Sequence, residues 1–353
     1  MNDMDSEILV SVVIPTYNSA NFIRECLEAT IRQSYRNIEI IVIDDGSKDT
    51  TMEICKTYAD RDSRIRLFTH ANVGASTTRN RGIRHAKGEY IVFFDADDYP
   101  EDNLIEKYIE AKEQWADRAV SFILCGMYND NLYNKHIENS ESILESAHGY
   151  IRGENYLLGR SSAATLSWLK LFNFVTNKFY NLKVIKEKEI SFDPDVAIGE
   201  DLKFNLDYLD NSEGYIGMIN LPLYHYIKRG DSSLSLSYHD GDVEDTKEIY
   251  RRFVAWEAAQ EGVIEDNVLL IKGIYVTDWV SRLTTLYEKH HRDELRPLVK
   301  KKLRNELQSE EFRGLLNDIY KAQKISRIRY YSLKIGSFEV FFFLRGIYQV
   351  LKG

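Results

Sequence analysis

Three acidic residues within four positions form the clearest chemical signal in the sequence. Asp95, Asp97 and Asp98 directly follow an apolar run, with Ala96 between the first two. Carboxylates this close together repel one another unless a cation neutralises them. Mg²⁺ and Mn²⁺ bind one or two carboxylates together with the phosphates of a substrate. The cluster therefore indicates a site for Mn²⁺ or Mg²⁺ and a phosphorylated ligand, although an acidic turn alone is a weak signal.

A second acidic pair, Glu200-Asp201, follows about a hundred residues later at the start of a helical pattern. Acidic residues are favoured at a helix N-terminus for electrostatic reasons alone, but a carboxylate there could also act as a general base. Further along the chain, His225 lies in an apolar strand pattern and Arg229 lies in a polar loop. His225 fits either a core histidine or a third metal ligand, and Arg229 fits either a solvated loop or a diphosphate contact.

Polar residues also follow the first three apolar segments of the chain. They could serve a nucleotide: a Tyr ring beside a planar base, carboxylates on a uracil N–H or on ribose hydroxyls, and a guanidinium at a helix start on a diphosphate. Helix capping, tight turns and surface ion pairs would explain the same residues more simply. These candidates are Pro15, Thr16, Tyr17, Asn18, Asp44, Asp45, Asn72 and Arg79.

The elements that must position these residues alternate along the first hundred positions. Apolar segments of strand length alternate with helical patterns, the strands at 9–14, 38–43, 65–69 and 90–94 and the helices at 21–33, 50–59 and 74–86. Such alternation is typical of a parallel sheet with helices on both faces. Ligands of these sheets bind beyond the carboxyl ends of the strands. Because each polar cluster follows a strand, we expect the clusters to meet at one edge of the sheet.

Length and composition predict two domains and exclude several classes of protein. The chain has 353 residues and a net charge of −9, which argues against nucleic-acid binding. Three cysteines cannot form a disulfide scaffold, and neither a signal peptide nor an apolar run of membrane-spanning length is visible, so we expect a cytoplasmic protein. We predict an α/β domain at 1–240 and a helical region at 241–353, where the net charge changes from −12 to +3.

The C-terminal tail combines positive charge with aromatic residues. Residues 321–353 carry a net charge of +6 and include Tyr330, Tyr331 and the run Phe341-Phe342-Phe343. Basic residues beside aromatic ones suit an anionic membrane surface. We therefore predict that the C-terminal region either docks at the inner face of the membrane or joins two copies of the chain. An ordinary amphipathic helix that packs on the rest of the protein would show the same pattern.

Two other classes of parallel-sheet protein fit the motifs less well. In phosphatases of the haloacid dehalogenase type, the D-x-D motif follows the first strand and continues with Gly and Thr or Val. In this chain the motif follows the fourth predicted strand and continues with Asp98-Tyr99-Pro100. A dinucleotide-binding fold requires a Gly-rich fingerprint after the first strand, and residues 15–20 do not contain one.

In their order and spacing, the motifs resemble those of family-2 glycosyltransferases of the GT-A fold, especially the bacterial members that build cell-surface glycans. The resemblance covers roughly residues 8–235 and rests on Val12-Val13-Ile14-Pro15-Thr16-Tyr17-Asn18, Ile43-Asp44-Asp45-Gly46-Ser47, Asn72-Val73-Gly74, Arg79-Asn80, Asp95-Ala96-Asp97-Asp98 and Glu200-Asp201. It implies a Rossmann-like, mainly parallel sheet with helices on both faces, plus the C-terminal helical region. It also implies transfer, with inversion, of a hexosyl or N-acetylhexosaminyl group from a nucleoside-diphosphate sugar, expected to be a UDP-sugar, to a glycan or lipid-linked acceptor.

The resemblance further implies roles for the matching residues. Asp201 would be the general base, and Asp97 would bind Mn²⁺ or Mg²⁺, with Asp95 and His225 as candidates for further ligands. Arg79 would face the diphosphate. The residues expected to hold the nucleotide sugar are Pro15, Thr16, Tyr17, Asn18, Asp44, Asp45, Asn72, Arg79, Asp95, Ala96, Glu200 and Arg229. The Gln-x-x-Arg-Trp motif of processive synthases does not follow Asp201, which argues against a polymerising synthase.

Two alternatives stay open at this point. A catalytically silent module could keep the fold and bind a nucleotide sugar, although the presence of Asp95, Asp97, Arg79 and Asp201 argues against it. A nucleotidyltransferase on a related sheet would favour a Gly-rich loop with Lys or Arg after the first strand, and residues 15–20 do not form such a loop.

Overall fold

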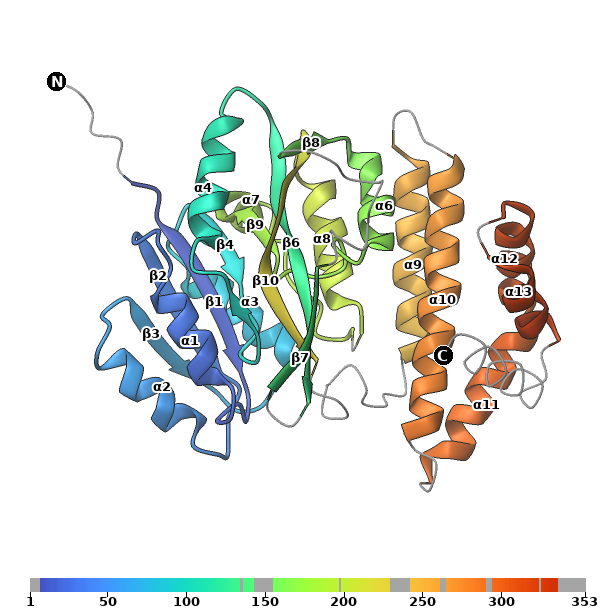
Figure 1. Cartoon of the computed structure of the whole chain (residues 1–353), viewed down its shortest axis with the longest axis horizontal. Coiled ribbons are helices and arrows are strands. Elements are labelled where there is room, and N and C mark those ends of the chain that lie inside the picture. The colour runs from blue at the N-terminus through green and yellow to red at the C-terminus, as the bar shows by residue number, and fades with distance from the viewer. Residues whose placement is uncertain are drawn as a thin grey trace. The chain divides into compact units, whose positions relative to one another are not determined.

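The computed structural model describes residues 7–133, 136–142, 155–196, 198–228, 242–260, 265–289, 294–323 and 325–335. The chain divides into two compact units, Met1–Gly230 and Asp231–Gly353, and this division lies ten residues before the boundary expected from composition. The first unit carries the sheet, and the described part of the second unit is helical (Figure 1).

Alternating strands and helices build the first part of the sheet. The elements are β1 (Val10–Thr16), α1 (Ile23–Ile31), β2 (Ile38–Asp44), α2 (Thr51–Ala59), β3 (Ile65–Thr69), α3 (Ala75–His85) and β4 (Tyr90–Phe93). Strand β1 pairs in parallel with β2 and β4, and β2 pairs in parallel with β3. Strands β1 and β2 are buried along nearly their whole length, as expected for strands covered on both faces. The predicted α/β class is confirmed.

The rest of the first unit extends this sheet with strands of both directions. The elements are β5 (Tyr99–Pro100), α4 (Leu104–Gln114), β6 (Val120–Tyr133), β7 (His136–Ser142), β8 (Tyr156–Leu158), the short 3₁₀ helix η1 (Arg160–Ser162), α6 (Ala163–Trp168), β9 (Lys178–Asn181), α7 (Leu182–Glu187), α8 (Glu200–Asp210) and β10 (Tyr215–Lys228). The order across the sheet is β3-β2-β1-β4-β9-β6-β10-β5, with β7 beside β6 and β8 beside β10 (Figure 1). Strand β9 lies antiparallel between β4 and β6, whereas β6 and β10 are parallel.

The first strand ends later than the sequence pattern predicts. Strand β1 continues through Pro15 to Thr16, because Pro15 and Thr16 stay in register with Ile43 and Asp44 of β2. A proline removes one donor from the strand but does not prevent an extended backbone. Strands β6 and β10 each have 14 residues. Their polar ends pair with neighbouring strands, which the apolar pattern does not reveal.

Close packing of α3 on β1 sets the position of the site. A Cβ atom on Gly82 would lie 2.3 Å from Cγ1 of Val13, so only glycine allows this approach. Residues three positions apart share one face of a helix. Arg79, three residues before Gly82, is therefore carried on the sheet-facing side of α3, toward the carboxyl end of β1.

The second unit contains helices α9 (Asp242–Ala258), α10 (Glu265–Lys289), α11 (Leu295–Gln308), α12 (Glu310–Lys321) and α13 (Arg327–Lys334). Helix α10 packs against α9, α11 and α12, and the buried side chains include Trp279 and Phe312. The predicted C-terminal helical region is thus confirmed for the residues that the structure describes. Within these residues, no helix combines the length and the apolar character that crossing a bilayer requires.

Candidate functional site

One guanidinium links three carboxylates that are far apart in the sequence. Arg79 Nη2 donates a hydrogen bond to Asp95 Oδ1 at 2.9 Å, and Nη1 lies 3.3 Å from Glu200 Oε1. Nη1 also lies 3.4 Å from Asp201 Oδ1, and the Arg79 side chain is only 7% exposed. The guanidinium lies over the ring of Phe192, 5.4 Å from its centroid. The structure therefore brings both acidic segments of the sequence into one cluster.

These side chains come from three parts of the chain that meet in the same region. Arg79 lies in the second turn of α3, Asp95 comes shortly after β4, and Glu200 and Asp201 are the first residues of α8. Gly199, which precedes α8, has a φ of +88°. This conformation is unfavourable for residues with a side chain, so glycine allows the sharp entry into the helix. Strand ends and helix starts thus meet where ligands of such sheets bind.

Asp201 has the electrostatic properties of a general base. The pKa of Asp201 is raised to about 7, mainly by burial. The positive charge of Arg79 lowers this pKa, whereas the negative charges of Glu200 and Asp95 raise it further. Asp201 Oδ2 accepts a hydrogen bond from the Val175 amide at 3.1 Å. Oδ1 is buried and has no hydrogen-bond donor within the described part of the chain. A carboxylate with a pKa near neutrality and one such oxygen is suited to accept a proton.

Arg79 is enclosed by carboxylates in this arrangement. Burial would lower the pKa of Arg79, but Asp201, Asp95 and Glu200 together raise it, so the guanidinium stays charged. One guanidinium faces three carboxylates, and this excess of acidic groups suits a divalent cation. The expected contact between Arg79 and a diphosphate stays a prediction.

Asp95 and Asp97 fit the metal site that the sequence predicts. Asp97 is exposed and the Asp95 side chain is 30% exposed, so their oxygens can reach a ligand. Strand β10 supports this loop, because the Asp95 amide donates to the Tyr224 hydroxyl at 3.0 Å. Among the described residues, no group of three or more His, Cys, Asp or Glu side chains forms a complete metal site. Two carboxylates fit an ion that completes its shell with phosphate oxygens and water.

His225 is held between two carboxylates and two aromatic rings. Its Nδ1 lies 2.6 Å from Asp130 Oδ2, and its Nε2 lies 2.9 Å from Glu101 Oε1. The rings of Tyr99 and Tyr128 each stack on the imidazole with centroids 4.4 Å away. Metal binding by His225 stays a prediction, and it would require one of these carboxylates to move.

The loop after β2 uses its two aspartates to hold the neighbouring loop. The Asp45 carboxylate accepts hydrogen bonds from the amides of Val73 at 2.7 Å and Gly74 at 2.9 Å, and from Asn72 Nδ2 at 3.2 Å. Asp44 accepts hydrogen bonds from the Ser47 amide at 3.2 Å and from Thr69 Oγ1 at 3.0 Å. The predicted nucleotide-binding residues Asp44, Asp45 and Asn72 therefore belong to one bonded region at the ends of β2 and β3.

The turn after β1 joins the same region and carries an exposed ring. Asn18 Oδ1 accepts a hydrogen bond from the Lys48 amide at 2.8 Å, and the Asn18 amide donates to Ser47 Oγ at 2.9 Å. Tyr17 is 43% exposed, whereas Thr16 Oγ1 is buried without a hydrogen-bond partner in the described part of the chain. An exposed ring and an unpaired hydroxyl next to each other are suited to a planar, polar ligand.

The remaining predicted residues add less to this geometry. Pro15 lies inside β1, and Ala96 is buried between Asp95 and Asp97. Glu200 joins the Arg79 cluster as described above. Arg229 lies outside the described residues.

Several side chains that shape the site were not singled out from the sequence. Asn80 pairs with the backbone of Phe192 through two hydrogen bonds of 2.7 and 2.8 Å, and this holds the ring that covers Arg79. His70 Nδ1 lies 3.3 Å from Asp45 Oδ1. Asn80 was visible as part of the Arg79-Asn80 motif, but nothing in the pattern indicated Phe192 or His70, because their contacts are made across long sequence separations.

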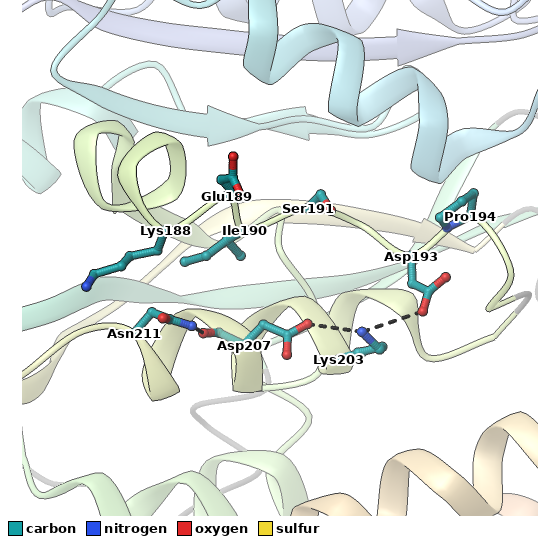
Figure 2. A pocket seen from close by; sticks show the side chains of 9 residues that line it. All are labelled: Lys188, Glu189, Ile190, Ser191, Asp193, Pro194, Lys203, Asp207 and Asn211. Carbon is teal, nitrogen blue, oxygen red and sulfur yellow. Dashed lines mark hydrogen bonds and ion pairs between the residues drawn. The ribbon is translucent and has the colours of Figure 1, made fainter.

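A hollow of about 370 Å³ lies elsewhere on the first unit, between residues 188–194 and one face of α8 (Figure 2). Lys203 lies 3.5 Å from Asp193 and 3.2 Å from Asp207 in its wall. With 3.6 residues per turn, Lys203 and Asp207 lie on the side of α8 opposite Asp201. The hollow is therefore distinct from the carboxylate cluster, and we assign the site by the cluster's chemistry.

Comparison with known proteins identifies the class to which this fold and site belong. The glycosyl transferase family 2 model matches residues 11–187, and the chain belongs to this family. It is 30% identical to the uncharacterized glycosyltransferase EpsJ of Bacillus subtilis (strain 168) over 249 residues, which cover 70% of this chain and 69% of EpsJ. It is also 30% identical to the glycosyltransferase GlyG of Streptococcus pneumoniae serotype 4 over 258 residues, covering 70% of this chain and 80% of GlyG.

A solved structure shares the fold at lower sequence identity. The crystal structure of S. aureus TarS 1-349 in complex with UDP-GlcNAc matches with a TM-score of 0.64 and 19% identity, covering 93% of this chain and 90% of TarS 1-349. The family and the GT-A fold expected from the motifs are confirmed. Between the alternatives left open by the sequence, family membership decides in favour of a glycosyltransferase.

Proposed function

We propose that this glycosyltransferase moves a sugar from a UDP-linked donor to an acceptor hydroxyl, with inversion and with a divalent cation. The observation that supports this most is the cluster around Arg79. It links Asp95, which comes shortly after β4, to Asp201, a largely enclosed carboxylate with a raised pKa at the start of α8. A transferase needs one group beside the leaving diphosphate and another beside the incoming hydroxyl, and these two carboxylates are placed for that division.

The donor is inferred from the nucleotide-side loops and from a relative of the same fold. Tyr17 is exposed beside the bonded region of Asp44 and Asp45, where a planar base could stack. TarS shares the fold and was crystallised with UDP-GlcNAc. We therefore propose a UDP-sugar that carries a hexosyl or N-acetylhexosaminyl group.

Asp95 and Asp97 would hold the cation, which we propose to be Mn²⁺ or Mg²⁺. When bound, such an ion stabilises the negative charge that develops on the departing diphosphate. Asp201 would accept the proton of the acceptor hydroxyl while the acceptor oxygen forms its bond to the anomeric carbon and the bond to the diphosphate breaks. A single displacement from the opposite face inverts the anomeric centre, so no enzyme nucleophile is required.

The acceptor class follows from the resemblance to bacterial enzymes of surface-glycan synthesis, and we propose a glycan or a lipid-linked glycan. A cytoplasmic enzyme that reaches a lipid-linked acceptor would benefit from contact with the membrane surface. In the described part of the tail, Tyr331 and Ile335 are 46% and 51% exposed, near the basic residues Arg327 and Lys334. Flotation with anionic liposomes should decrease at high salt; no flotation would favour a role of the tail in packing or in joining two copies.

The test of the proposed function is a panel of UDP-, GDP- and TDP-sugars, incubated with Mn²⁺ or with a chelator. We expect nucleoside diphosphate to be released from at least one UDP-sugar with Mn²⁺ and not with the chelator. The Asp201→Asn variant, purified in the same way, serves as the control for contaminating enzymes. NMR of the product's anomeric proton tests inversion. Release from none of the donors, or equal release with the chelator, would contradict the proposal.

A further inference from the structure

Lys178 is a fully buried lysine for which the proposed reaction has no direct use. Its side chain is 0% exposed, and Nζ donates hydrogen bonds to Leu171 O at 2.9 Å, to Asn177 Oδ1 at 2.9 Å and to Phe174 O. Three acceptors match the three protons of an ammonium group. Burial lowers the pKa of Lys178 to about 7, while the charge of Asp201 acts in the opposite direction.

A buried ammonium group needs a reason beyond stability. Removal of a charge from water is unfavourable even after partial compensation, and an apolar side chain of similar volume would fill the space without that cost. The rings of Phe122 and Phe172 lie 5.9 and 5.8 Å from Nζ, so apolar neighbours are already present. The role of Lys178 is therefore to be found in the groups that accept its hydrogen bonds.

Two of the three acceptors, the carbonyls of Leu171 and Phe174, belong to one short segment, residues 171–175. Side chains from two elements hold this segment by its backbone. From β9 and the residue before it, Lys178 and Asn177 donate to the carbonyls of this segment. From α8, Asn205 Nδ2 donates to Phe172 O at 2.6 Å and to Phe174 O at 3.1 Å. The segment is thus attached to the helix that carries Asp201 and to the strand that carries Lys178.

The segment in turn holds the catalytic carboxylate, since the Val175 amide donates to Asp201 Oδ2. Its other oxygen, Oδ1, lies 3.4 Å from Arg79 Nη1. We propose that Lys178 is a positioning residue for the transfer reaction, which fixes the 171–175 segment so that the Val175 amide orients Asp201 toward the acceptor hydroxyl. This inference rests on the proposed role of Asp201 as general base and adds a residue that does not touch the substrates.

The charge of Lys178 should also affect the pH dependence of the reaction. The titratable and charged groups that interact with Asp201 are Arg79, Glu200, Asp95, Lys178 and Tyr180. Removal of one positive charge disfavours the ionised carboxylate. Lys178→Met should therefore move the acid limb of the pH profile of kcat/KM to higher pH, because Asp201 must be deprotonated to act as a base. A residue that only supports packing would leave this limb in place.

The first measurement does not depend on activity. Hydrogen–deuterium exchange of peptides that cover residues 171–177 is compared between the wild-type chain, Lys178→Met and Asn205→Leu, all at full length. We expect faster exchange in both variants, because each removes donors that hold this segment. Lys183→Met is the matched control: Lys183 is 75% exposed on α7 and should leave exchange unchanged. Unchanged exchange in both variants would overturn the inference, whatever the enzyme's donor proves to be.

The second measurement is kinetic, with the donor identified by the nucleotide-sugar panel. We expect kcat to fall about 10²-fold in Lys178→Met and in Asn205→Leu, with the donor KM nearly unchanged, because misplacement of a catalytic group by about 1 Å has that effect. Only Lys178→Met should also shift the acid limb, since Asn205→Leu removes no charge. If Lys178→Met does not fold, Asn205→Leu decides. A normal kcat with faster exchange would restrict the network to a structural role, whereas a panel without turnover would contradict the proposed function separately.

Discussion

The loop after β2 carries the buried Asp45, and the start of α8 carries Asp201, whose side chain is 15% exposed. The surroundings of the two carboxylates differ. Asp45 accepts hydrogen bonds from two backbone amides and from a side-chain amide, so its charge is compensated by donors that it holds in place. Asp201 accepts one hydrogen bond from an amide, lies at 3.4 Å from Arg79, and has two like charges nearby that raise its pKa. The first arrangement stabilises a loop, and the second keeps a carboxylate reactive at some cost in folding free energy.

The same contrast explains why acidic residues at strand ends cannot all be assigned one role. Hydrogen bonds from several amides satisfy a carboxylate and fix the backbone around it. Burial together with neighbouring carboxylates leaves a carboxylate with a tendency to accept a proton. Substitutions in the two regions should therefore affect different properties.

The metal-dependent step should be the most sensitive. Asp97→Asn is expected to reduce turnover to background even at saturating Mn²⁺, because an amide oxygen is a weaker ligand for a hard cation than a carboxylate. Turnover is measured as release of nucleoside diphosphate, and the midpoint of thermal unfolding should be unchanged because Asp97 is exposed. Normal turnover of this variant would contradict the assignment of Asp97 as a ligand.

Loss of the general base should separate chemistry from donor binding. Asp201→Asn should lower kcat by about 10²–10⁴-fold, with the affinity for UDP in the presence of Mn²⁺ nearly unchanged in calorimetry. Its free energy of unfolding should not fall, because the variant removes a buried charge with two like-charged neighbours. Weak UDP binding would instead place Asp201 in the donor site.

Asp45 should show the opposite behaviour from Asp201. Each Asp45 oxygen accepts one backbone amide, so Asp45→Asn replaces one of these acceptors by an NH2 group that cannot accept. The change should lower the free energy of unfolding by about 1–3 kcal/mol, measured by urea denaturation. Asp60→Asn, at an exposed position after α2, is the matched control and should change stability by less than about 0.5 kcal/mol. If Asp45→Asn and Asp60→Asn are equally stable, Asp45 does not stabilise its loop in the way proposed, and its contrast with Asp201 is lost.

The pH dependence of the reaction should respond to Glu200. Since the base must be deprotonated, kcat/KM should fall as the pH drops through the raised pKa of Asp201, near 7. The charge of Glu200 contributes to that rise, so Glu200→Gln should move the acid limb to lower pH. Glu187→Gln, an exposed change on α7, should leave the limb unchanged. A shift in the opposite direction would mean that the limb reports another group.

The order of strands and helices could be predicted because each element depends mainly on its own residues. The apolar segments and helical patterns of the first hundred residues correspond to β1 through β4 and α1 through α3. The lengths of β6 and β10 and the antiparallel position of β9 could not be predicted, since strand pairing depends on residues far apart in the chain. Pro15 shows the same limit, because its pairing with Ile43 keeps it within the strand.

The amino-acid sequence was sufficient to infer the family, the parallel first half of the sheet and the acidic segments at the carboxyl ends of its strands. Local patterns suffice for these features, since hydrophobic periodicity and turn residues act over a few positions. The packing of the chain was needed to show that Arg79 lies among Asp95, Glu200 and Asp201, and that Lys178 is buried against the backbone of residues 171–175. The strength of an ion pair and the shift of a pKa depend on distance and on exclusion of water, and both are set only when α3, α8 and β9 pack together.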